Sequence, residues 1–140
     1  MSVDSSNLDA ALSALLLSDT VLAGICTDGV YFDVASQGAQ RFLLISLVEE
    51  YDEPEFQRRA FENPLYLVKA VVLATTGADV KTAAARIDAL LEQGTLTATG
   101  FTVTGMQREA RVRYTEVDQV DPSIRWQHRG GNYRVFAGVV

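Results

Sequence analysis

Apolar positions recur at helical spacing in two stretches of the chain. In residues 5–17 they occupy Leu8, Ala11, Leu12, Leu15 and Leu16. A second stripe of the same period runs through residues 79–93, where Asp79 is placed to cap the N-terminus and Gly94 to end the helix. Both patterns predict amphipathic helices that lie on a core. A further short helical turn is expected to open at Asp19.

Two longer apolar runs predict the central strands of a sheet. Residues 42–51 and 65–75 are rich in β-branched and other large apolar side chains. In the run 65–75 both alternating faces are mainly apolar, whereas an antiparallel sheet commonly leaves one face in water. We therefore expect this strand to be covered on both sides, either by helices or by a neighbouring subunit.

The remaining strands are predicted from shorter patterns. A first strand fits Val30–Val34, and a Thr/Gly-rich segment, Thr95–Gly105, leads into a strand with regular alternation. Its two faces hold Ala110, Val112 and Tyr114 on one side, and Gln107, Glu109, Arg111, Arg113 and Thr115 on the other. A polar loop is expected over Glu116–Arg129, followed by a turn at Gly130-Gly131. The last strand is marked by Tyr133, Val135, Ala137 and Val139.

A polar segment, Asp52–Pro64, separates the two central strands. Its two prolines and eight polar side chains exclude a central strand, and it is longer than a simple hairpin needs. We predict a long arm between antiparallel neighbours.

The order of predicted elements along the chain is α, β, β, β, α, β, β. It defines an α+β fold with a mostly antiparallel mixed sheet flanked by two main helices. Neither repeats nor a linker interrupt it, which predicts a single domain over residues 1–140.

Composition and charge are those of an acidic globular protein. The chain has 140 residues, a hydrophobic fraction of 48% and a net charge of −6, which excludes a disordered chain. The first residues carry no positive charge, and no apolar run approaches the roughly 20 residues of a membrane span. We expect an untargeted soluble protein that does not enter membranes.

The residues that could support catalysis or bind a cofactor are few. The one cysteine, Cys26, lies in an apolar stretch typical of a buried residue, and the one histidine, His128, falls in the predicted polar loop without a nucleophile motif. Neither a P-loop nor a G-x-G-x-x-G pattern occurs. An acidic cluster at residues 49–55 lacks the spacing of a calcium loop and is interpreted as a solvated strand end. We therefore expect no enzymatic activity, no cofactor and no metal.

Charge is unevenly distributed along the chain. Residues 107–140 hold six arginines and four acidic residues, a net of +2, whereas residues 1–106 have a net of −8. This asymmetry fits head-to-tail docking between copies of the chain. A nucleic-acid patch is disfavoured because Glu109 interrupts the arginine row and the whole chain is negative. An exposed strand face with cross-strand ion pairs is the remaining alternative.

Several segments together resemble a known family. The segment Arg125–Val135 reads RWQHRGGNYRV, and a W-x-H-R-G-G pattern before a closing strand is similar to the C-terminal pattern of the tail terminator, or tail completion, proteins of long-tailed bacteriophages. The helix AAARIDALLEQG with Thr/Gly-rich strands after it, and the opening ALSALLLSDTVLAGI, fit the same family less specifically. The resemblance covers nearly the whole chain.

The resemblance implies a structural protein of the virion neck. Members of this family form a ring, commonly hexameric, that caps the head-proximal end of the tail tube, stops tube polymerisation and offers the surface that joins the head-tail connector or stopper proteins. Assembly takes place in the host cytoplasm, and DNA only passes through the lumen without specific binding. Three features fit this function: an apolar strand that needs cover on both faces, a long arm and oppositely charged segments.

Two groups of residues are the candidates for interfaces. The first group lies on the arm and comprises Phe56, Arg58, Arg59 and Phe61. The second lies in the predicted late loop and comprises Arg125, Trp126, His128 and Arg129. Aromatic side chains in polar loops either bind a partner or pack back on their own sheet. Alternative functions are another neck component, such as a head completion or stopper protein, and a small-ligand-binding α+β dimer; a hydrolase or transferase is the weakest alternative.

Overall fold

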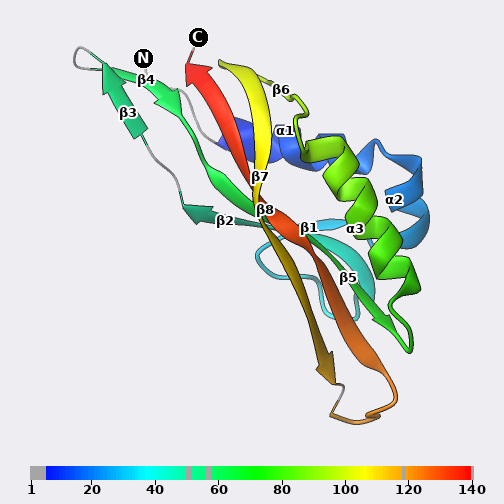
Figure 1. Cartoon of the computed structure of the whole chain (residues 1–140). Helices are drawn as coiled ribbons and strands as arrows, with labels where there is room; N and C mark the ends of the chain where they lie inside the picture. Colours follow the sequence, from blue (N-terminus) through cyan, green and yellow to red (C-terminus); the bar gives the residue numbers. More distant parts are fainter. Residues whose placement is uncertain (1–5, 50–51, 56–57, 118, 140) are drawn as a thin grey trace.

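The computed structural model describes residues 6–49, 52–55, 58–117 and 119–139. Within them the chain forms three helices and eight strands (Figure 1). In order they are α1 (Ser6–Leu17), α2 (Thr20–Ile25), β1 (Val30–Phe32), β2 (Arg41–Glu49), β3 (Asp52–Glu55), β4 (Arg58–Glu62), β5 (Leu65–Ala74), α3 (Ala78–Leu91), β6 (Thr97–Ala98), β7 (Phe101–Val117) and β8 (Arg125–Val139). The predicted α+β class is confirmed.

Strand β8 organises the sheet. The strands follow the order β1-β2-β5-β8-β4-β3, with β7 on the other edge of β8 and β6 paired to β7. Every pair is antiparallel except β1 with β2. One edge of β8 pairs with β5 over Arg125–Arg134 and then with β4 through Ala137 and Gly138. The prediction that β2 and β5 are antiparallel central strands is confirmed.

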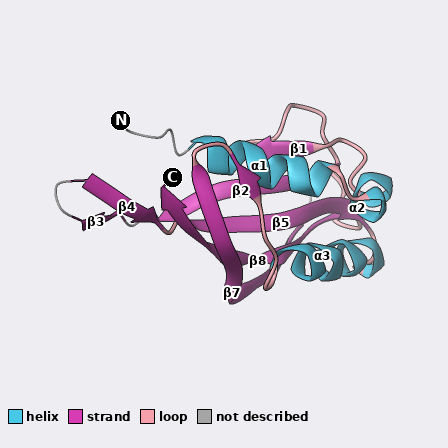
Figure 2. Cartoon of the chain, turned by 90° about the horizontal axis from the view of Figure 1, so that it is seen from above, coloured by secondary structure: helices cyan, strands magenta, loops and turns pink. Residues whose placement is uncertain are grey.

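The long helices α1 and α3 lie on the same face of the curled sheet (Figure 2). Helix α1 buries Leu8, Leu12 and Leu16, and α3 buries Val80, Ala83, Ile87 and Leu91. They pack in one core with alternate residues of β5 and β8: Tyr66, Val68, Ala70, Val72, Tyr133, Val135 and Ala137. Each fully buried leucine or isoleucine stabilises the fold by about 1.5–3 kcal/mol, so this layer is the main source of stability.

The short helix α2 is fixed by the buried carboxylate of Asp19. One oxygen accepts the backbone N–H of Leu22 at 3.1 Å, and the other accepts Arg86 Nε of α3 at 2.8 Å. The predicted turn at Asp19 is therefore confirmed, and the same side chain joins α2 to α3.

The two ends of α3 differ from the prediction. Its N-cap is Gly77, and Asp79 lies in the first turn, where it pairs with Arg41 at 2.6 Å. At the other end the helix stops at Leu91, and the left-handed residue is Gln93, with φ 58°, in place of Gly94. The backbone N–H of Gln93 donates to the carbonyl of Met106 in β7, so a tertiary hydrogen bond ends the helix early.

The arm and the late segment are more regular than predicted. The arm Asp52–Pro64 contains the hairpin β3–β4, and Glu116–Arg129 is a loop only between the end of β7 and Arg125. Gly130-Gly131 is not a turn, because both glycines lie inside β8 between β5 and β7. A Cβ on Gly130 would approach the carbonyl oxygen of Val68 to 2.1 Å. The pair therefore permits close contact between backbones.

The second face of β5 is covered without a helix in the described part of the chain. Val71 and Lys69 are buried on this face although neither belongs to the core under α1 and α3. Aromatic side chains of flanking strands provide the cover: Tyr114 lies over Lys69, and Tyr31 packs edge-on against Phe42. The predicted helix is therefore not found on this face among the described residues, and the aromatic cover is partial, since Leu67 and Leu73 remain partly exposed. Cover by a neighbouring subunit stays a prediction.

Candidate interaction surfaces

The hairpin β3–β4 extends beyond the ends of β2 and β5 (Figure 1). Its strands pair from Asp52 with Glu62 to Glu55 with Arg58, and β4 joins β8 only through two residue pairs. Of the four arm candidates, Phe56 lies outside the described residues, and for the others, on β4, only the backbone is described: Arg58, Arg59 and Phe61. Their role at an interface stays a prediction.

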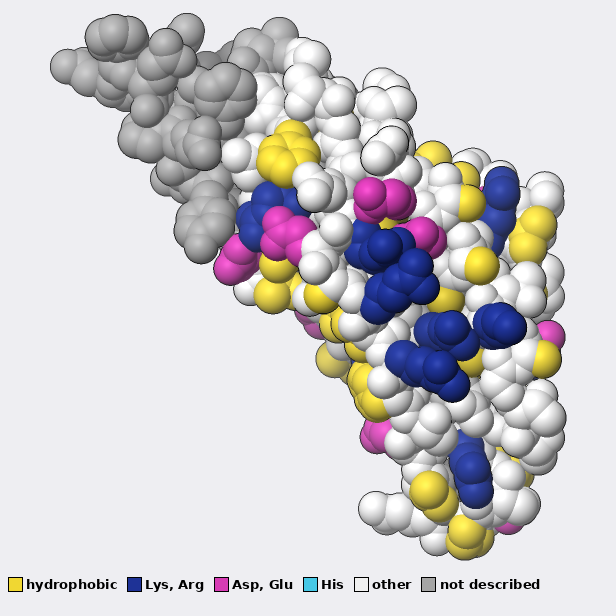
Figure 3. All heavy atoms as spheres, in the orientation of Figure 1, with side chains coloured by type: hydrophobic (Ala, Val, Ile, Leu, Met, Phe, Trp, Pro, Cys, Tyr) yellow, Lys and Arg dark blue, Asp and Glu magenta, His cyan; other side chains and the backbone are white. Residues whose placement is uncertain are grey.

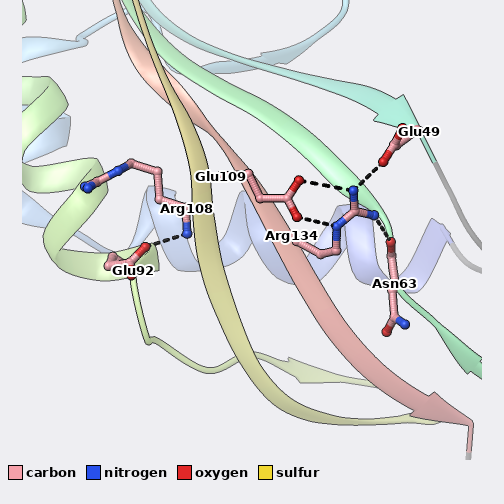
Figure 4. A network of polar contacts seen from close by, with 6 residues as sticks. All are labelled: Glu49, Asn63, Glu92, Arg108, Glu109 and Arg134. Atoms are coloured by element: carbon pink, nitrogen blue, oxygen red, sulfur yellow. Dashed lines mark hydrogen bonds and ion pairs between the residues drawn. The ribbon is translucent and has the colours of Figure 1, made fainter.

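One guanidinium, that of Arg134, holds the base of the arm (Figure 4). Its Nη1 donates to the backbone oxygen of Asn63 at 2.7 Å, and its Nη2 contacts the carboxylate of Glu49. These two partners flank the arm on either side in the sequence. A third partner, Glu109 of β7, accepts from Nε at 2.7 Å and from Nη2 at 3.2 Å. Arg134 therefore joins β2, β7 and β8 to the residue that follows the hairpin.

The electrostatics of this cluster are favourable on both sides. The hydrogen bonds from Arg134 lower the pKa of Glu109, and the same contacts raise the pKa of the Arg134 guanidinium. In the sequence, Arg134 is one of six arginines in residues 107–140. No local signal distinguishes it, because its partners come from three distant segments that meet only in the sheet.

A β-bulge separates Glu109 from the other charges of β7. The register with β8 shifts between Arg108 and Ala110, and the carboxylate of Glu92 accepts the backbone N–H of Arg108. As a result Arg108 points to the helix side, and Glu109 points to Arg134 (Figure 4). The predicted alternation, with Glu109 on the face of Arg111 and Arg113, is therefore wrong at this position.

The bulge leaves an open groove of about 520 Å³ between α3, β7 and β8. It is lined by five cationic side chains, which we call the basic groove: Lys81, Arg108, Arg111, Arg113 and Arg129. Lys and Arg side chains gather in several neighbouring clusters along a diagonal of this face of the molecule (Figure 3). The walls are small or apolar, with Ala84 and Ala85 on α3. The groove therefore presents positive charge on a surface that an extended partner can approach.

Among the described residues, one carboxylate lines the basic groove, that of Asp88, and it is already paired. Asp88 Oδ1 accepts Arg108 Nη1 at 2.7 Å and the Tyr133 hydroxyl at 2.9 Å. Burial opposes its ionisation, but these two hydrogen bonds, together with the charges of Arg108 and Arg111, outweigh burial and lower the pKa of Asp88. Burial together with Asp88 also raises the pKa of the Tyr133 hydroxyl. Asp88 and Arg108 thus form a structural pair.

The other four cations of the groove have no carboxylate partner among the described residues. Arg113 and Arg129 are direct cross-strand neighbours, and Arg111 lies two positions from Arg113 on the same face. Like charges directly opposite each other in a sheet are destabilising. The free protein therefore retains an electrostatic strain that an anionic group in the groove would relieve.

A second polar cluster lies on the opposite face of the sheet, around His128. Its ring stacks on Tyr114 with 4.2 Å between centroids, and Lys69 Nζ donates to the Tyr114 hydroxyl. His128 Nε2 lies 2.6 Å from a carboxylate oxygen of Glu116. Burial lowers the pKa of His128, the charge of Lys69 lowers it further, and Glu116 opposes both.

The late candidates do not form one surface. Arg125, Trp126, His128 and Arg129 lie on β8 and not in a loop, so successive side chains alternate between faces. Arg129 enters the basic groove, whereas His128 is buried on the other face. Trp126 shares the face of His128, opposite Leu73. The sequence identified Arg129 and Arg113 as charges, but not that they meet.

Other kinds of site are limited in the part of the chain that the structure describes. Burial raises the pKa of the Cys26 thiol to about 12, so this residue behaves as a packed apolar group. Among the described residues, no three His, Cys, Asp or Glu side chains gather as a metal site. In the same residues, none of the helices combines the length and the apolar character required to span a bilayer.

Comparisons with known proteins support the fold. No protein-family model matches the sequence, and no curated protein does either. A solved chain from the structure described as "Virion of native gene transfer agent (GTA) particle" superposes with a TM-score of 0.71 at 19% identity, covering 94% of both chains. A second solved chain, known by a sequence identifier alone, has a TM-score of 0.61 at 12% identity and covers 99% of this chain and 98% of its own. The fold is thus shared over the full length.

Proposed function

We propose that this protein is a structural component of a phage-like virion, and specifically a tail terminator. The observation that carries the proposal is the full-length fold similarity to a chain of a gene transfer agent virion. The superposition covers 94% of this chain and 94% of that chain, so the similarity extends over the helices and the sheet together. The C-terminal pattern around Trp126 and Gly130-Gly131 supports the same assignment through its resemblance to tail terminator proteins.

In this proposal the chain acts as one domain, residues 1–140, and assembles into a ring of six copies. The ring caps the head-proximal end of the tail tube and stops its polymerisation. Its other face joins the head-tail connector or stopper proteins, which places the protein in the neck of the virion. It has no catalytic function and no cofactor. DNA passes through the ring without specific contacts.

The geometry supports a contact between unlike surfaces. The arm β3–β4 extends from one end of the sheet (Figure 1), whereas the basic groove is lined by residues from the middle of β7 and β8. A contact that joins different surfaces of neighbouring copies is heterologous. It closes into a ring when a whole number of copies, each rotated by the same angle relative to the last, completes one full turn. A dimer around a two-fold axis would instead pair one surface with itself.

The native mass of the purified protein tests the proposal. Light scattering on a sizing column, over a range of concentrations, should show a species near 92 kDa, six copies of the 15.3 kDa chain, either alone or after addition of tail-tube protein. Binding to tube protein, compared with binding to portal-side proteins, separates a terminator from a head completion or stopper protein. A monomer or dimer that never enlarges with tube protein would refute the ring.

A further inference from the structure

The basic groove has a surplus of charge that nothing in the described part of the chain neutralises. Five cations and the single carboxylate of Asp88 give it a net charge of +4, in a chain whose net charge is −6. The rest of the chain therefore carries −10. Since Arg108 is held by Asp88, the groove offers Lys81, Arg111, Arg113 and Arg129 to a ligand.

The arm carries the complementary charge. The arm, residues 52–64, contains four acidic residues and two arginines, a net charge of −2. Three of the acidic residues, Asp52, Glu53 and Glu55, lie on β3, whereas Arg58 and Arg59 lie on β4. The first strand of the hairpin is therefore an extended anionic segment.

A single chain cannot bring these two surfaces together. The arm joins β8 at Ala137 and Gly138, whereas the groove is lined by Arg129 and Gly130 of the same strand. Eight residues of β-strand, from Gly130 to Gly138, span about 26 Å. The hairpin also extends away from the groove (Figure 1). Any contact between arm and groove is therefore made between copies.

We propose that the basic groove binds the acidic arm of a second copy of this chain, and that this contact links neighbouring subunits of the ring. The inference rests on the proposed ring function and adds the surfaces that form its subunit interface. A net charge of +4 meets a net charge of −2, and the like charges of Arg113 and Arg129 gain carboxylates that none of the described residues of their own chain supplies. Duplex DNA is the less favoured occupant because the remaining surface of the chain is strongly negative.

The first test reverses charge on either side of the contact. Arg111→Glu with Arg113→Glu should raise the concentration at which rings form by tenfold or more, and Asp52→Lys with Glu53→Lys should do the same. Combining the four changes should recover at least half of the lost assembly, since the pairs are then reversed together. Gln37→Glu is the control: it adds negative charge at an exposed position of the loop between β1 and β2, outside the groove, and should leave assembly unchanged.

Folding of each variant is checked by circular dichroism and thermal unfolding. The variant with Arg111→Glu and Arg113→Glu, called the groove variant, should melt at a temperature no lower than the wild type, because it removes like charges that face each other.

A crosslinking measurement tests the contact independently of how strongly the rings assemble. When R113C and E53C chains are mixed under mild oxidation, a disulfide should join unlike chains, whereas Q37C mixed with E53C should give none. Cys26 is buried and stays apart from this reaction.

The outcomes separate the two proposals. The arm–groove contact would be overturned if the wild type and the groove variant formed rings equally well and R113C gave no crosslink with E53C. That result would leave the terminator function standing. The same would follow if the groove variant assembles normally but loses binding to a 20-base-pair DNA duplex, which would assign the groove to nucleic acid. A wild type that never forms rings with tube protein would refute both the function and the contact built on it.

Discussion

Replacing Arg134 by methionine should destabilise the protein by about 2–3 kcal/mol. Methionine keeps the length and the apolar stem of the side chain but removes every donor. The change deletes the hydrogen bond to the Asn63 carbonyl, the paired contact with Glu109 and the contact with Glu49. Only 11% of the Arg134 side chain is exposed, so water replaces the lost donors poorly.

The magnitude follows from how each partner is solvated. A hydrogen bond to a charged group contributes about 1.5–3 kcal/mol when both groups are buried. Here the side chains of Glu109 and Glu49 are 39% and 40% exposed, so both can recover hydration, and their ion pairs contribute little. The carbonyl of Asn63 loses its side-chain donor in a half-buried position, and that loss makes up most of the expected change.

Urea unfolding followed by circular dichroism measures the effect as a shift of the midpoint at constant slope. Arg113→Met is the matched control, because it removes the same charge from a neighbouring strand at a position without an ion-pair partner among the described residues. It should change the free energy of unfolding by less than about 0.5 kcal/mol. Equal effects of the two substitutions would refute the assignment of Arg134 as the residue that holds the arm. Hydrogen exchange at β4 should also become faster in R134M and not in R113M.

Three further changes test other parts of the structure. Burial lowers the pKa of His128 in the folded state, so near the ordinary pKa of about 6.5 the unfolded chain binds more protons than the folded protein does. The free energy of unfolding should therefore fall as pH decreases from about 7.5 to 5.5. His128→Gln should flatten this dependence, measured as urea midpoints at each pH. Gly130→Ala should lower the free energy of unfolding by more than about 3 kcal/mol or abolish soluble expression, because its Cβ meets the backbone of Val68 and Lys69. Gly24→Ala is the control: its Cβ meets nothing within 4 Å, so this variant should melt near the wild type. The Cys26 thiol, with a pKa of about 12, should react with a disulfide reagent only as fast as the protein unfolds, and rapid labelling of the native protein would contradict its burial.

The local pattern of the sequence was sufficient for the elements that form the core. The stripes that begin at Leu8 and Val80 became α1 and α3, and the apolar runs 42–51 and 65–75 became β2 and β5. These predictions succeed because helix and strand periodicity is a property of neighbouring residues and of one face turned to the core. The turn at Asp19 was predicted for the same reason, since a cap uses a side chain and an N–H three residues apart.

Features that depend on a distant strand were decided only by the tertiary structure. Gly130-Gly131 has the sequence of a turn, but its glycines serve close contact with β5 and β7 on either side. The left-handed residue after α3 is Gln93, because Met106 of β7 accepts its N–H. In each case a local preference was overridden by a hydrogen bond or contact with a segment far along the chain.

The candidate surfaces show the same division. The sequence by itself determined that six arginines lie in the last 34 residues and that the arm is acidic. Whether these charges gather or separate depends on one bulge, at Arg108 and Ala110, which turns Glu109 toward Arg134 and leaves Arg111 and Arg113 on the groove side. Because a shift of one residue exchanges the two faces of a strand, composition fixed the charge of this protein, and strand register decided where that charge is presented.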